Sequence, residues 1–139
     1  ELLKEIETNF VNHHEIIKET LPNMIKKKWG RIIFFGSSGA LKSDIGLSGY
    51  TSSKYATLGY CKVLSKEYAR YGITSNYLSL GLFNTESYLK LEKRTKLKLL
   101  ESTDTKNVGD FKSIYNCINF IIESDYVSGA KIPIDGGFN

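Results

Sequence analysis

Tyr50 and Lys54 stand four residues apart in this sequence, and Ser37 precedes the tyrosine by thirteen residues. Residues four apart on a helix share one face, with about 5–6 Å between their Cβ atoms. A lysine ammonium would therefore lie beside a phenol, and a nearby positive charge favours the phenolate form of a tyrosine. With a serine hydroxyl close by, the three groups suit general acid–base chemistry on a substrate oxygen. The tyrosine–lysine spacing alone is common, so the prediction depends on the elements around it.

The composition is that of an ordinary globular domain. The chain has 139 residues, of which 41% are hydrophobic and 24% charged, and this favours one domain with a sizeable core. No apolar run approaches the roughly eighteen residues that span a bilayer, and no signal peptide is visible. Cys61 and Cys117 match no metal or redox spacing, which favours reduced core thiols. We therefore expect a single-domain cytoplasmic protein that does not enter membranes.

The net charge of +4 is mild, and the basic residues gather at 26–28 and at 90–98. Such runs are usually solvated surfaces. The alternative is a docking surface for an anionic partner, such as an acidic carrier protein or a phosphorylated substrate. No nucleic-acid-binding module or array of aromatic and basic residues accompanies the charge, so we expect no nucleic-acid partner.

Helical and strand patterns alternate along the chain. The predicted elements are a helix at 1–28, a strand at 31–36, a loop at 37–49, a helix at 50–70, a strand at 73–80, a loop at 81–85, a weakly patterned segment at 86–106, a helix at 108–124 and a strand at 130–134. This alternation predicts an α/β fold with a parallel sheet and helices on both faces. The apolar run at 32–35 predicts a strand buried on both faces. Pro22 predicts a kink or a restart in the first helix.

In such sheets, ligands bind beyond the carboxyl ends of the strands. Ser37 follows the first predicted strand, and the loop at 81–85 follows the second. We therefore expect these motifs to converge at one edge of the sheet. The segment at 86–106, which is long and weakly patterned, is expected to act as a mobile substrate lid.

Five motifs in a consistent order make the prediction specific. They are IETN ending at Asn9, GRIIFFGSS ending at Ser38, YTSSK from Tyr50 to Lys54, YGITSNYLSLGLFNT ending at Thr85, and SGAKIPIDGGF near the C-terminus. Together they resemble the motifs of the short-chain dehydrogenase/reductase family over the whole sequence. The resemblance implies the C-terminal half of a Rossmann-like, doubly wound parallel sheet with three strands, three main helices and the lid.

The resemblance implies a catalytic tetrad of Asn9, Ser37, Tyr50 and Lys54. In this interpretation Tyr50 donates a proton during carbonyl reduction and accepts one during alcohol oxidation, while Ser37 orients the substrate oxygen. Lys54 binds the ribose hydroxyls of a nicotinamide cofactor and favours the phenolate. Asn9 holds a water that links Lys54 to solvent. It lies twenty-eight residues before Ser37, and this spacing favours Ser37 over Ser38 as the catalytic serine.

The resemblance also implies that Thr85 and the backbone at Phe83 hold the nicotinamide carboxamide, with NAD or NADP as the cofactor that carries the hydride. Two features depart from the family pattern. Leu80 stands where a proline is usual, which predicts a looser turn before Gly81. A glycine-rich phosphate loop is absent from the sequence, so we expect that the chain is the catalytic half of a longer protein.

Other chemically active residues have simpler interpretations. His13 and His14 have no cysteine or carboxylate at metal-ligand spacing, so we expect a hydrogen-bonded or solvent-facing pair and no metal site. Asp135 precedes two glycines and is expected to be a turn residue.

The function predicted by this resemblance is NAD(P)-dependent interconversion of a carbonyl and a secondary alcohol. A 3-oxoacyl thioester, small or carrier-bound, is the favoured substrate, and a sugar or another small ketone or alcohol is the alternative. A non-catalytic truncated fragment is a different alternative. The resemblance also implies a dimer or tetramer, with the helices at 1–28 and 50–70 at the interface.

Overall fold

The computed structural model describes residues 1–138, and in it three parallel strands form one sheet in the order β1-β2-β3. The strands are β1 (Gly30–Ser37), β2 (Ile73–Leu80) and β3 (Lys131–Ile134). Ser37 is in register with Leu80, and Leu80 is in register with Ile134. The carboxyl ends of all three strands therefore coincide at one edge, as the sequence predicts.

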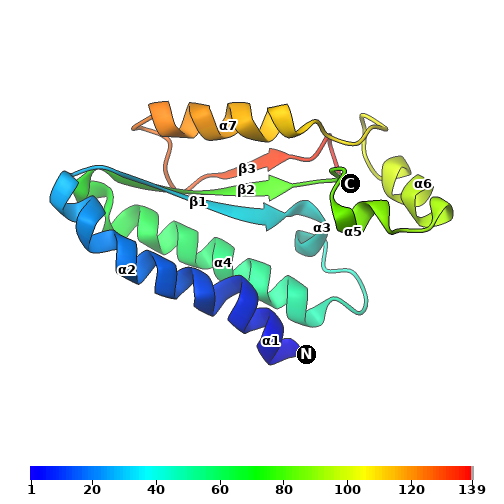
Figure 1. The fold of residues 1–139 in the computed structure, drawn as a ribbon, viewed down its shortest axis with the longest axis horizontal. Helices are drawn as coiled ribbons and strands as arrows, with labels where there is room; N and C mark the ends of the chain where they lie inside the picture. Colours follow the sequence, from blue (N-terminus) through cyan, green and yellow to red (C-terminus); the bar gives the residue numbers. More distant parts are fainter. Residues whose placement is uncertain (139) are drawn as a thin grey trace.

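Helices cover both faces of this sheet. They are α1 (Leu2–Ile6), the π-helix η1 (Glu7–Val11), α2 (Asn12–Lys27), α3 (Ser38–Leu41), α4 (Ser48–Glu67), the 3-10 helix η2 (Ala69–Tyr71), α5 (Glu86–Leu89), α6 (Lys93–Glu101) and α7 (Phe111–Glu123). Figure 1 shows α2 and α4 along one face, α7 along the other, and α5 and α6 beyond the carboxyl ends of the strands. This arrangement confirms the predicted α/β class. In residues 1–138 no helix is long and apolar enough to cross a membrane.

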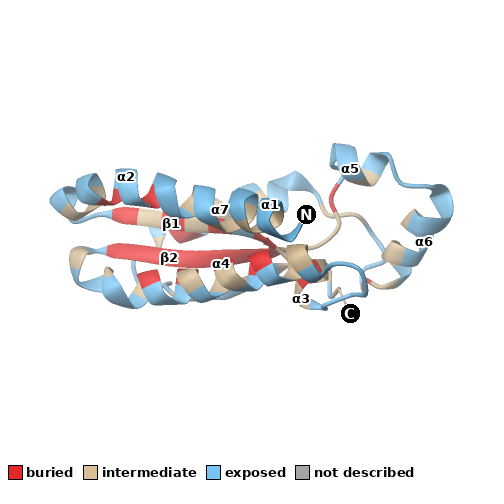
Figure 2. Cartoon of the chain, turned by 90° about the horizontal axis from the view of Figure 1, so that it is seen from below, coloured by how far each residue is buried: buried red, intermediate tan, exposed pale blue. Residues whose placement is uncertain are grey.

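The core lies between the sheet and the helices α2 and α4. Ile17 and Leu21 of α2 pack in one cluster with β1 and α4, and they are one helical turn apart, as one buried helical face requires. Strand β2 is buried along seven of its eight residues, and it forms the continuous buried band in Figure 2. Burial on both faces is the expected state of a central parallel strand covered by helices.

The prediction that the run at 32–35 is buried on both faces is wrong for β1. Ile32 and Phe34 are buried, whereas Phe35, on the opposite face, is 48% exposed. The cause is the position of α7, which reaches β1 near its start. There the Arg31 guanidinium donates to the carbonyls of Ile121 and Ile122.

The first helix is interrupted, but at a different place from the predicted one. Helix α2 continues through Pro22 to Lys27, and the irregular turn is the π-helix at Glu7–Val11. A proline removes a single N–H donor, and the buried Leu21 beside it holds this helix against the core. The π-helix is a widened turn of a kind that frequently occurs at functional sites.

The predicted loop at 37–49 begins with the short helix α3, and the predicted helix at 108–124 begins later, at Phe111. A side chain determines each start. The Ser37 hydroxyl accepts a hydrogen bond from the Ala40 amide, and the Asp110 carboxylate accepts one from the Lys112 amide. Both are N-caps, which satisfy amides that a helix leaves without internal partners.

Two glycines give a test of the close packing at the edge where the strands end. A Cβ at Gly81 would lie 2.5 Å from the Asp135 Cα atom, whereas a Cβ at Gly59 in α4 would meet no atom within 4 Å. We predict that Gly81→Ala lowers the free energy of unfolding by about 1–3 kcal/mol because the ends of β2 and β3 must separate. Gly59→Ala should raise it by about 0.5–1 kcal/mol, because alanine is the better helix former.

Urea unfolding of the protein measures both values. Equal effects of the two substitutions would contradict the packing described at Gly81.

Candidate active site

A pocket of about 380 Å³ opens where the strands end. Ser37 and Tyr50 line it together with Phe83 and Thr85 of the loop that follows β2. Four residues named from the sequence are therefore brought to one cavity. Lys54 and Asn9, the other two, do not line it.

Lys54 lies one helical turn after Tyr50 on α4, and its side chain is buried, with 8% of its surface exposed. Its ammonium nitrogen is 5.6 Å from the centroid of the Tyr50 ring and donates a hydrogen bond of 3.2 Å to the carbonyl oxygen of Phe35. The fourth residue after Tyr50 therefore places a positive charge beside the phenol, as the spacing predicts. The bond to Phe35 also joins α4 to the end of β1.

Burial lowers the pKa of Lys54, because the protein interior disfavours the charged ammonium, and the carboxylate of Glu5 partly opposes this effect. Burial also lowers the pKa of His13, and the charge of Lys54 lowers it further. The ammonium therefore occupies a site where its charge acts on neighbours through little solvent.

Asn9 lies in the π-helix η1, which contacts α4. Its side-chain amide donates to the Glu5 carboxylate at 2.8 Å, and its backbone carbonyl accepts from the Thr57 hydroxyl at 2.8 Å. The bond from Thr57 joins the wide turn to α4. Asn9 is thus linked to Lys54 through Glu5, whose carboxylate accepts from Asn9 and acts on the Lys54 charge.

Ser37 and Ser38 point to different environments. Ser37 lines the pocket, its hydroxyl accepts from the Ala40 amide at 3.1 Å, and its own backbone amide donates to the Tyr77 hydroxyl. The Ser38 hydroxyl is buried and bonds to Ser79 of β2 and to the carboxylate of Asp135. Only Ser37 faces the cavity, which agrees with the choice made from the spacing.

The carboxylate of Asp135 also accepts hydrogen bonds from the amides of Gly137 and Phe138. Gly136 and Gly137 both have positive φ, as a tight turn of this kind requires. Asp135 is therefore a turn residue, as predicted, and in addition it fastens the turn to Ser38.

The loop between β2 and α5 is held by its own backbone. The Thr85 amide donates to the Phe83 carbonyl at 2.7 Å, and the Thr85 hydroxyl accepts from the Tyr88 amide as the N-cap of α5. The hydroxyl keeps its own hydrogen for a ligand. Phe83 is buried and its ring lies 5.7 Å from that of Phe111, so the loop is anchored beneath the pocket.

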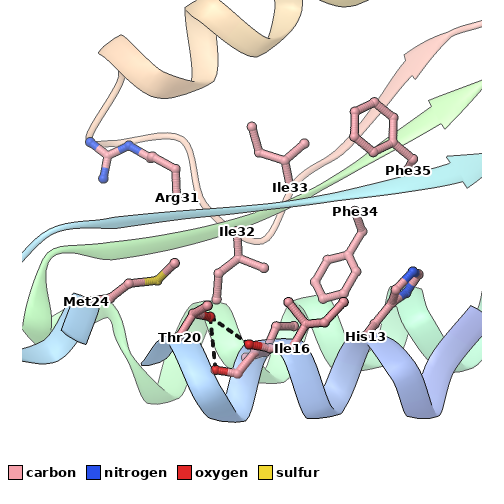
Figure 3. Close-up of a pocket in the computed structure, with 10 residues that line it drawn as sticks. His13, Ile16, Thr20, Met24, Arg31, Ile32, Ile33, Phe34 and Phe35 are labelled. Atoms are coloured by element: carbon pink, nitrogen blue, oxygen red, sulfur yellow. Dashed lines mark hydrogen bonds between the residues drawn. The ribbon is translucent and has the colours of Figure 1, made fainter. Parts of the chain in front are cut away.

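A second cavity, of about 310 Å³, runs along the outer edge of β1, and Figure 3 shows the side chains around it. Its lining is mostly apolar, and the exceptions are His13, Thr20 and Arg31. Within the described residues the buried Nδ1 atom of His13 has no hydrogen-bond partner, although a hydrogen bond with the backbone of Asn9 raises the pKa of this residue and partly opposes the effect of burial. The expectation of a hydrogen-bonded or solvent-facing residue therefore stays a prediction for His13. The expectation is confirmed for His14, which bonds to the Tyr60 hydroxyl at 2.9 Å.

The sequence interpretation missed two residues of the site, Glu5 and Tyr77. Glu5 had a local signal, since it lies four residues before Asn9, the spacing of neighbours on one helix face. Tyr77 had none. Its contact with Ser37 depends on the register of two strands that are forty residues apart in sequence.

Comparison with known proteins identifies the family of these motifs. The family model described as short chain dehydrogenase matches residues 1–96. A 3-oxoacyl-(acyl-carrier-protein) reductase of Mycobacterium avium is 29% identical over 95% of this chain and 52% of its own length. The corresponding enzyme of Buchnera aphidicola is 32% identical, with 95% and 55% covered. Carbonyl reductase family member 4 of Xenopus tropicalis is 31% identical, with the same coverage.

A solved structure described as a dehalogenation enzyme shares the fold, with a TM-score of 0.90 at 22% identity. The superposition covers 99% of this chain and 59% of the other. The chain thus spans about half the length of the curated relatives it matches.

The burial of Lys54 predicts a pH dependence of stability. Between its lowered pKa and the value of about 10.4 for a free lysine, the unfolded chain binds more protons than the folded one. The contribution of Lys54 to the free energy of unfolding should therefore increase as the pH rises through this interval. In Lys54→Met this contribution is absent, so the wild-type value minus the variant value should increase with pH.

Chemical unfolding of both proteins at a series of pH values from neutral to about 10.4 measures this difference. A difference that stays constant, or that falls as the pH rises, would show that the pKa of Lys54 is not lowered.

Proposed function

The chain belongs to the short-chain dehydrogenase family, and on that premise we propose that it carries the catalytic centre of an NAD(P)-dependent oxidoreductase that interconverts a carbonyl and a secondary alcohol. The observation that carries the proposal is that two hydroxyl groups share one pocket and that a buried ammonium lies beside one of them. Ser37 and Tyr50 line it, and the Lys54 ammonium stands beside the Tyr50 ring.

In the proposed mechanism, the Ser37 hydroxyl donates a hydrogen bond to the substrate oxygen. Its oxygen already accepts from Ala40, so its hydrogen is the part left for a ligand. During reduction, Tyr50 gives its proton to the same substrate oxygen, and during oxidation it removes that proton. The charge of Lys54 stabilises the phenolate that this transfer leaves.

The residues at the pocket fit the nicotinamide end of NAD or NADP. The Lys54 ammonium has three N–H donors. Within residues 1–138, one of them donates to the carbonyl of Phe35. The others suit the ribose hydroxyls, and the Thr85 hydroxyl and the Phe83 backbone suit the carboxamide. When bound, this cofactor supplies or accepts the hydride. We assign to Asn9 the holding of a water that returns a proton to Lys54.

The pocket favours a carbonyl on an apolar chain over a sugar. Its further lining is largely apolar, from Leu82, Tyr88, Leu91, Leu99, Phe111 and Ile114. A sugar would need more hydroxyl partners than these side chains offer. The apolar lining supports a 3-oxoacyl thioester as the substrate. The two bacterial relatives, both named as 3-oxoacyl-(acyl-carrier-protein) reductases, support the same substrate. Because α5 and α6 supply part of the lining, we propose that residues 86–106 act as the lid.

We further propose that a dinucleotide-binding half completes the enzyme at the open edge of β1. The half-exposed Phe35 and the mostly apolar cavity along that edge suit such a partner (Figure 3). Exposed apolar side chains of η1 and α4, among them Val11, Tyr55 and Val63, support a homo-oligomer through these helices.

The test is reduction of an acetoacetyl thioester by the full-length protein, with NADH and NADPH compared by absorbance. Tyr50→Phe should lower kcat at least about a hundredfold, the lower range for loss of a general acid. Tyr55→Phe is the matched control, because Tyr55 is on the same helix and its hydroxyl bonds to the Leu41 carbonyl, away from the pocket lining. It should keep near-normal turnover.

Normal turnover by Tyr50→Phe would refute the mechanism. A preference for a sugar over the thioester would refute the substrate and leave the mechanism in place.

A further inference from the structure

Tyr77 is a phenol enclosed in the middle of the sheet. It belongs to β2, lies opposite Phe34 of β1, and has no exposed surface. A hydroxyl in such a place costs stability unless it is hydrogen-bonded. Its partner is the backbone of Ser37, whose amide donates to the Tyr77 hydroxyl at 3.3 Å.

The absence of a side chain at Gly36 leaves the space that the Tyr77 ring occupies. Phe34 and Gly36 lie on the same face of β1, because alternate residues of a strand share a face. The Tyr77 ring extends from the level of Phe34 to that of Gly36, where a Cβ would overlap the ring and the hydroxyl. The side chain therefore spans two residues of β1 and ends at Ser37.

Ser37 is consequently fixed twice, at its amide by Tyr77 and at its hydroxyl by the Ala40 amide. The second bond orients the hydroxyl, and the first fixes the backbone that carries it. Tyr77 itself does not line the pocket, whereas Gly36 and Ser37 do. The hydrogen bond of the Tyr77 hydroxyl leads to Ser37, so we expect this hydroxyl to act on the reaction through Ser37.

We propose that Tyr77 is a positioning residue, whose hydroxyl holds the end of β1 so that Ser37 presents its own hydroxyl to the substrate oxygen. The proposal rests on the proposed function. It goes beyond the residues assigned there by adding one, in β2, that touches neither substrate nor cofactor.

The chemistry of the phenol suits this role. Burial raises the pKa of Tyr77, and the hydrogen bond from Ser37 only partly opposes it. The titratable groups of α4 that face it are Tyr50, Tyr55 and Cys61, and each acts to raise the pKa as well. The phenol therefore stays neutral, so it accepts from the Ser37 amide without placing a negative charge near Tyr50.

Tyr77→Phe removes the hydroxyl and keeps the ring. The first measurement is amide hydrogen–deuterium exchange, resolved to Ser37, on the full-length protein. Exchange at Ser37 should become at least about tenfold faster, because the amide loses an acceptor. Tyr60→Phe is the control, since it removes a hydroxyl bonded to His14 instead. It should leave exchange at Ser37 unchanged.

The second measurement is kinetic. Tyr77→Phe should lower kcat for the thioester by roughly tenfold, with KM within about twofold, as expected when one hydrogen bond that positions a reacting group is lost. In the Ser37→Ala background the same substitution should change kcat by less than about twofold, because no serine hydroxyl remains to be positioned.

An equal loss of kcat in both backgrounds would overturn the proposal, because it would mean a general structural effect. Unchanged exchange at Ser37 would overturn it as well. The exchange measurement needs no turnover, so it separates the two proposals. A wild-type protein without reductase activity would refute the proposed function, and exchange would then still decide whether Tyr77 holds the Ser37 backbone.

Discussion

The buried ammonium of Lys54 is the interaction on which the rest of the site depends. A charge in the interior is costly unless polar groups surround it. Here the Phe35 carbonyl binds it directly, and the carboxylate of Glu5 acts on it from α1. These partners come from separate elements, so placing this one charge fixes the end of β1 against α4. Tyr50, one turn before Lys54, is thereby held at the mouth of the pocket.

The neighbouring serines show how the sheet supports this arrangement. Ser38 turns inward to Ser79 and Asp135, which joins the start of α3, directly after β1, to β2 and to the turn after β3. Ser37, the adjacent residue, is thereby left facing the cavity. Alternation of side chains along an extended chain sends neighbours to opposite sides. One of the two hydroxyls therefore holds the fold together while the other is available for chemistry.

Much of this could be predicted from the sequence, because local patterns determine it. The predicted strand at 73–80 coincides with β2. The four-residue spacing of Tyr50 and Lys54 correctly predicts that the ammonium lies beside the Tyr50 ring. Features that depend on distant partners were missed. The π-helix contains Asn9, whose carbonyl is bound by Thr57 from another helix, and the contact of Tyr77 with Ser37 needs the strand register. The catalytic roles of the predicted residues stay predictions.

The central claim is that the charge of Lys54 makes Tyr50 an effective base. The most direct measurement is the pH profile of kcat for alcohol oxidation, compared between the wild-type protein and Lys54→Met. Removing a positive charge 5.6 Å from the Tyr50 ring disfavours the phenolate. The profile of the variant should therefore move to higher pH. An active Lys54→Met protein with an unshifted profile would contradict the account.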